Sequence, residues 1–158
     1  MNRIRVALVL VALAGTACSA RSATEDWVTD TENAHHVADE RVARGDADGA
    51  RAVLRSAIES KAPKTTNAED ARVVRQDLYY RLAALELSQN RPEDAIRWAT
   101  AGLDLGNGTD VFTANLHIAR GKALERRGDA SGASRDYHDA LLITEALLDK
   151  TLGDKGNP

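Results

Sequence analysis

Several residue types that stabilise other kinds of fold are scarce in this sequence. Its 158 residues include one cysteine, three prolines and one phenylalanine, and aromatic residues make up 4% of the chain. A single cysteine can form neither an intramolecular disulfide nor a thiolate metal cluster. The core must therefore be built from the Ala, Leu, Val and Ile of a chain that is 43% hydrophobic. Because this composition favours helices over a β-sandwich, we expect an all-α fold.

A surplus of positive charge is also lacking. Lys and Arg number 21 and Asp and Glu number 24, the net charge is -3, and the two signs are interspersed along the chain. No sustained positive field is available to attract a phosphate backbone, so we expect no nucleic-acid partner. The sequence also lacks a glycine-rich phosphate loop after a strand and a nucleophile in a recognisable motif. We therefore expect no enzyme activity, no catalytic residues and no cofactor.

The histidines give little support for a metal site. His35 and His36 are adjacent, so on a helix they point about 100° apart and cannot chelate one ion together. Glu32, His36 and Glu40 share a helix face at four-residue spacing and could hold a divalent ion weakly. A solvated charged face is the commoner explanation of such a pattern. We therefore predict no metal site.

The first twenty residues have the pattern of a secretory signal. Arg3 and Arg5 precede a short apolar run that ends at Ala14, and small residues then lead to Cys18. A positively charged start, a short apolar core and small residues before a cleavage point are typical of an exported protein. The apolar run is too short to cross a bilayer as a helix, which takes about 20 residues. We interpret it as a signal core rather than a permanent anchor.

The residues that end this segment, Leu13-Ala14-Gly15-Thr16-Ala17-Cys18, resemble the lipobox of bacterial lipoproteins. In that family, a turn of small residues precedes a cysteine that is acylated and becomes the new N-terminus. The family usually has Leu three residues before the cysteine, whereas this chain has Gly15 there and Leu13 two residues further back. The match is therefore partial.

The lipobox resemblance implies an N-terminal address. Residues 1–17 are expected to be a signal peptide, Cys18 the lipidation site and residues 18–24 a tether. Ser19 follows the cysteine, where the inner-membrane retention rule would want Asp, so the resemblance implies the outer membrane, with the protein facing the periplasm. The alternative is ordinary signal cleavage after Ala17 or Ala20, without a lipid.

Three segments of the remaining chain share one local pattern. Gly45, Asn90 or Gly128 follows a run with helical periodicity, as a left-handed residue often does at the end of a helix. A short polar stretch then starts a second run. Each segment therefore predicts a helix-turn-helix hairpin. The expected helices span residues 25–44, 47–61, 68–89, 92–105, 110–127 and 130–152.

The hairpins resemble the tetratricopeptide repeat, a motif of about 34 residues with small side chains where its two helices touch. The resemblance implies three antiparallel hairpins stacked as a short α-solenoid over residues 25–152, with a flexible tail at 153–158. Leu147, Leu148 and Leu152 are expected to make the last helix an end cap. Positions 8, 20 and 27 of the motif hold Ala38, Ala83 and Gly121, then Ala50, Ala95 and Ala133, then Ala57, Gly102 and Ala140.

In this family, the first helix of each hairpin lines a concave face that binds partners. The middle hairpin places Tyr80, Ala84 and Leu87 there as an apolar strip, which suits a peptide with an apolar anchor. The alternative is that Tyr80 and Leu87 pack against a neighbouring helix. The predicted partner-binding residues are His35, Asp39, Asp77, Tyr80, Ala84, Leu87, Asn115, Ile118 and Lys122.

These resemblances imply a membrane-tethered adaptor for protein-protein interaction in the bacterial envelope. Its partner is expected to be another envelope protein, whose identity the sequence does not give. Two alternatives remain open. One is a pilotin-like assembly helper for an outer-membrane secretin, and the other is a structural subunit of an envelope complex.

Mass spectrometry of the mature protein tests the lipid prediction. We expect the N-terminal residue to be Cys18 carrying acyl chains, and Cys18→Ser to release the protein from the membrane fraction, since each buried methylene contributes about 0.8 kcal/mol to anchoring. An unmodified Cys18 thiol in the membrane-bound protein would exclude the lipoprotein interpretation.

Overall fold

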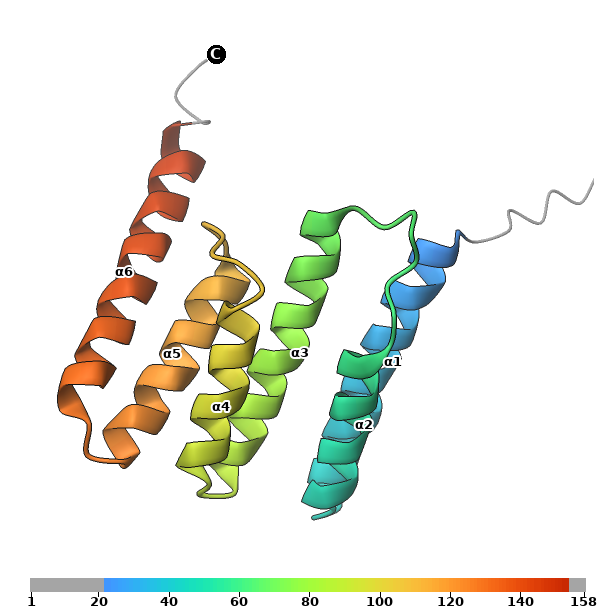
Figure 1. Ribbon diagram of the computed structural model, residues 1–158, viewed down its shortest axis with the longest axis horizontal. Coiled ribbons are helices and arrows are strands. Elements are labelled where there is room, and N and C mark those ends of the chain that lie inside the picture. Colours follow the sequence, from blue (N-terminus) through green and yellow to red (C-terminus); the bar gives the residue numbers. More distant parts are fainter. Residues whose placement is uncertain (1–21, 154–158) are drawn as a thin grey trace, which may run out of the picture.

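The computed structural model describes residues 22–153, and their fold is all-α, as predicted (Figure 1). Each helix begins and ends within two residues of its predicted limits. The predicted signal peptide, Cys18 and residues 154–158 of the predicted tail lie outside the described residues. The helices are α1 (Ala23–Ala43), α2 (Ala47–Glu59), α3 (Ala68–Ser88), α4 (Pro92–Leu103), α5 (Val111–Arg126) and α6 (Ala130–Gly153).

The turn within each hairpin is fixed by one left-handed residue. Gly45, Asn90 and Gly128 have φ angles of 78°, 57° and 82°, so the three predicted turn residues are confirmed. In each turn the following backbone amide donates to the carbonyl five residues earlier, which closes the preceding helix. Asp46 and Asp129 then accept the amide of the residue three positions ahead and start the second helix.

The three hairpins stack side by side in chain order (Figure 1). Within hairpins α1 packs on α2, α3 on α4 and α5 on α6, and between hairpins α2 contacts α3 and α4 contacts α5. The first helices α1, α3 and α5 also contact one another in sequence and form what we call the first-helix face. Among the described residues, the backbones of α2, α4 and α6 do not approach each other, although the Arg55 guanidinium of α2 lies 5.9 Å from the centre of the Trp98 ring of α4. This arrangement is the predicted stack of antiparallel hairpins.

Small side chains allow the paired helices to approach closely. Of the nine residues predicted to be small crossing points, eight are buried and Ala57 is half-buried. A Cβ atom on Gly102 would lie 2.8 Å from the Leu116 methyl groups, and one on Gly121 would lie 2.7 Å from the Tyr137 ring. A larger residue at either position would force two helices apart.

The end of the last helix differs from the expectation. Leu148 and Leu152 are 57% and 59% exposed, so their predicted capping role is wrong. The reason is length, because α6 has 24 residues and its partner α5 has 16. The last turns of α6 therefore extend past α5 (Figure 1) and, within residues 22–153, have no hairpin to cover. Leu141 and Leu142 are exposed on the same helix.

Adjacent alanines on α3 provide a test of the close packing. Ala83 is fully buried in the core between α3, α4 and α5, whereas Ala84 is half-buried on the first-helix face. Ala83→Leu should lower the free energy of unfolding by about 1–3 kcal/mol, because a tightly packed core must separate, while Ala84→Leu should cost less than about 1 kcal/mol. Urea unfolding followed by circular dichroism measures both. Equal losses would contradict the packing described.

Candidate binding groove

A groove runs between α1 and α3 on the first-helix face. One part of it, which we call the Tyr80 pocket, has a volume of about 360 Å³. Tyr80, Ala84 and Leu85 of α3 line one wall, and residues of α2 lie between the two walls. The pocket is mainly apolar, which is typical of a surface that accepts a hydrophobic side chain. The pocket is also lined by Ala38, Asp39 and Val42 of α1 and by Leu54 of α2.

A second cavity, which we call the Phe112 pocket, lies further along α1 and α3. It has a volume of about 240 Å³ and lies between the N-terminal half of α1 and the first half of α3. Val28, Val73 and Val74 line it, and Phe112 reaches it from α5. Glu32, His35 and Asp77 line the same cavity on the side toward the Tyr80 pocket.

The groove is open because α3 carries large side chains where it faces the first hairpin. Aligning the repeats pairs Arg81 and Leu85 of α3 with Ala119 and Ala123 of α5. The two alanines are 3% and 0% exposed in the core between the second and third hairpins, where α5 lies directly on its neighbours. Arg81 and Leu85 instead line the Tyr80 pocket. Larger side chains at a helix crossing increase the distance between helices, so α1 stands further from α3 than α3 does from α5.

The first hairpin is fastened to the second through α2 rather than α1. Leu54 of α2 shares a buried cluster with Leu78 and Leu82 of α3. Beside this cluster, Arg51 forms a bidentate ion pair with Glu86, in which Nε lies 2.5 Å from Oε1 and Nη2 lies 3.1 Å from Oε2. The Glu86 side chain is only 1% exposed, so this pair is shielded from water. Such charge-assisted pairs fix geometry well and leave α1 free to form a groove wall.

A polar centre separates the two pockets. Asp77 Oδ2 lies 3.5 Å from His35 Nδ1 and 3.5 Å from Arg81 Nε, and Arg81 Nη1 donates to Asp39 Oδ2 at 3.4 Å. Burial lowers the pKa of His35, and the positive charge of Arg81 lowers it further against the opposing effect of Asp77. The imidazole is therefore uncharged at neutral pH and does not balance the negative charge of the carboxylates.

The structure brings five of the nine predicted partner-binding residues together. Asp39, Tyr80 and Ala84 line the Tyr80 pocket, and His35 and Asp77 line the Phe112 pocket. Their role in binding stays a prediction.

The other four predicted residues lie elsewhere. Leu87 is 8% exposed and packs in the core between α3, α4 and α5, so we leave it out of the site. Asn115 and Ile118 are half-buried and Lys122 is exposed, all on α5 and outside both pockets. On this side of α3, α5 packs tightly against the second hairpin.

Some groove residues were not anticipated from the sequence. Arg81 and Leu85 line the groove although neither was among the predicted partner-binding residues, and Leu54 reaches it from α2. Phe112 is the one phenylalanine of the chain. Because aromatic side chains often line binding cavities, it could have been singled out from the sequence, and it lines the Phe112 pocket.

A cluster at the other end of the stack resembles a metal site only in composition. Ligand atoms of His117, Asp136 and Asp139 lie within 4.8 Å of one another. However, Arg120 Nε lies 2.8 Å from Asp136 Oδ2 and Arg120 Nη2 lies 2.7 Å from Oδ1, so both carboxylate oxygens already have a cationic partner. We assign this cluster to the joining of α5 and α6.

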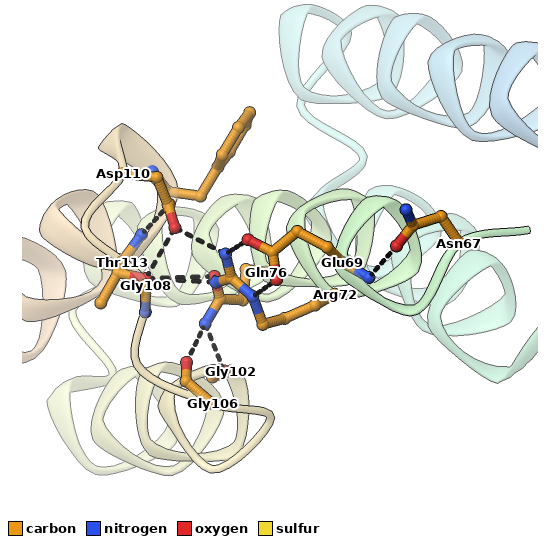
Figure 2. A network of polar contacts seen from close by, with 10 residues as sticks. Asn67, Glu69, Arg72, Gln76, Gly102, Gly106, Gly108, Asp110 and Thr113 are labelled. Atoms are coloured by element: carbon orange, nitrogen blue, oxygen red, sulfur yellow. Dashed lines mark hydrogen bonds and ion pairs between the residues drawn. The ribbon is translucent and has the colours of Figure 1, made fainter.

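A second polar network fastens the connection between α4 and α5 to the start of α3 (Figure 2). The buried amide of Gln76 donates to the carbonyls of Gly102 at 3.1 Å and Gly106 at 2.8 Å. Arg72 Nη2 lies 2.7 Å from Asp110 Oδ2, and Asp110 also caps α5. Because its polar groups are bonded to each other, we interpret this network as structural.

No family model matches the chain, and no curated protein matches it. In the part of the chain that the structure describes, every helix is too short or too polar to cross a membrane.

The acid response of Asp110 tests the polar network. Burial raises the pKa of this carboxyl, but the backbone amide of Thr113 and the Arg72 guanidinium outweigh burial and hold the pKa below its usual value. The lowered pKa of Asp110 stabilises the folded protein fully at pH values above about 4, which is the pKa of an aspartate in the unfolded chain. This stabilisation is lost as the pH falls through the lower pKa of the folded state.

Asp110→Asn, which keeps a capping side chain, should therefore be less stable than the wild type at pH 7, and the difference should shrink below about pH 4. Chemical unfolding at several pH values measures this difference. Asp149→Asn on the exposed surface of α6 is the control. A wild-type advantage that is the same at pH 7 and pH 3 would contradict the assignment.

Proposed function

We propose that this protein is a tetratricopeptide-like adaptor of the bacterial envelope that binds a segment of another protein in the groove between α1 and α3. The groove itself supports the proposal. It includes two pockets of about 360 and 240 Å³ that are lined mainly by apolar residues. A lipid on Cys18 would tether the adaptor to the outer membrane, and this part of the proposal rests on the sequence alone.

The chemistry of the groove favours binding over catalysis. Its two aliphatic hydroxyl groups are engaged with their own helices, since Ser88 Oγ donates to the Leu85 carbonyl and Thr31 Oγ1 donates to the Trp27 carbonyl. Neither hydroxyl is bonded to a base, as an activated nucleophile would be. The remaining surface consists of aliphatic side chains, Tyr80 and a few ion pairs. Such a lining provides anchors for a peptide.

A second function, that of a subunit in a larger envelope complex, is favoured by the exposed leucines of α6. Leu141, Leu142, Leu148 and Leu152 are each at least half exposed on one helix, and exposed apolar patches often mark permanent contacts. The pilotin-like role rests on the family resemblance only.

Site-specific photo-crosslinking in intact cells separates these functions. A photoreactive residue replaces Ala84 in the groove, exposed Ala52 on α2 as the matched control, or Leu148 on α6. Groove binding predicts one discrete protein adduct from position 84 and none from position 52. An adduct from position 148 alone would support the subunit role instead. Identical products from positions 84 and 52 would contradict binding in the groove.

A further inference from the structure

We infer that the segment bound in this groove carries a Lys or Arg side chain between two apolar side chains. The inference rests on the proposed function and adds the chemistry of the occupant. The inference is based on charge complementarity, because an acidic centre lies between two apolar pockets. Each part of this surface favours one kind of side chain in the bound segment.

The outer parts of the groove accept apolar side chains. Val42 of α1 is 45% exposed beside the Tyr80 pocket, where water contacts hydrocarbon that a partner could cover. In the Phe112 pocket, Val28, Val73 and Val74 present a similar surface. Covering such surface stabilises a complex by roughly 25 cal/mol for each Å² removed from water. An apolar side chain at each end of the bound segment therefore provides anchoring.

The centre of the groove has an excess of negative charge. The charged residues that line the two pockets are Glu32, Asp39 and Asp77 on the acidic side and Arg81 on the basic side. His35, the remaining titratable group there, is neutral at neutral pH because burial lowers its pKa. Three carboxylates thus face one guanidinium. An acidic segment would be repelled by this centre, and an apolar one would leave carboxylates desolvated without a partner.

These carboxylates have bonding capacity left for a ligand. The contacts of Arg81 with Asp39 and Asp77 measure 3.4 and 3.5 Å, whereas Arg120 and Asp136 approach to 2.7 and 2.8 Å. Long contacts are weak, so Arg81 does not saturate its acceptors. The Asp39 side chain is also 71% exposed, which leaves it accessible to an incoming cation.

The spacing of the pockets sets the spacing of the anchors. On α1 the residues lining one pocket lie about eight positions from those lining the other, which corresponds to about 12 Å along the helix. A helical segment spans this distance between residues i and about i+7, and an extended segment between residues i and about i+4. In both cases the cation lies midway between the anchors.

Designed peptides test the inference on the purified full chain. One peptide is helical with leucines at i and i+7, the other is extended with leucines at i and i+4, and each is made with Lys or with Glu midway. Fluorescence anisotropy at low ionic strength measures binding. We expect at least one Lys peptide to bind about tenfold more tightly than its Glu counterpart, since three carboxylates attract one charge and repel the other. Added salt should reduce this preference.

Variants of the chain locate the binding. Asp39→Asn should reduce the preference for Lys about threefold, because its pairing is solvent-exposed and modest. Asp30→Asn is the matched control, as Asp30 is on the same helix with the same charge but lies on the side toward α2. Ala84→Leu fills the Tyr80 pocket and should weaken both peptides. Circular dichroism verifies that each variant is folded.

The possible results distinguish this inference from the proposed function. Equal binding of Lys and Glu peptides, no binding of any peptide, or equal effects of Asp39→Asn and Asp30→Asn would overturn the inference about charge. If the photoreactive residue at position 84 still captures one protein in cells, the proposed binding in the groove is supported even though the inference about charge is wrong. If the chain forms a dimer and Val42→Asp dissociates it, the groove binds a second copy of the chain. This result would overturn both the proposed function and the inference about charge.

Discussion

The size of the side chains where helices cross is the constraint on which this structure depends. Wherever two helices of a hairpin touch, an alanine or glycine occupies the crossing, and a Cβ on Gly102 or Gly121 would already meet its neighbour within 3 Å. The same constraint operates between hairpins, where Ala119 and Ala123 allow α5 to lie directly on the second hairpin. Arg81 and Leu85 at the equivalent positions of α3 keep α1 at a distance, and the groove is the result.

Polar contacts determine which helices stay fastened while the groove remains open. Arg51 and Glu86 fix α2 to α3 through a buried pair, and Arg120 and Asp136 fix α5 to α6. In the groove, the contacts of Arg81 and His35 with the carboxylates are longer, at 3.4 to 3.5 Å. The strength of the polar contacts therefore follows their role, with short shielded pairs at permanent joints and loose pairs on the surface available to a partner.

The sequence predicted the parts of the structure that depend on local backbone and on steric size. Gly45, Asn90 and Gly128 were recognisable because few residues adopt a left-handed backbone, and the small crossing residues because the motif needs them. The groove was only partly predictable. The repeat frame assigned binding residues to all three first helices, whereas tight packing of α5 buries Leu87 and leaves Asn115 and Ile118 outside the pockets. Which helices separate depends on tertiary packing at several residues together, and no local pattern encodes that.

Arg81 keeps the first hairpin apart from the second and so opens the groove. A crystal structure of the Arg81→Ala variant beside that of the wild type tests it directly, since alanine occupies the equivalent position of α5. We expect α1 to move closer to α3 by about 1 Å or more and the Tyr80 pocket to shrink below its volume of about 360 Å³. An unchanged distance between α1 and α3, with a pocket enlarged by the missing side chain, would contradict it.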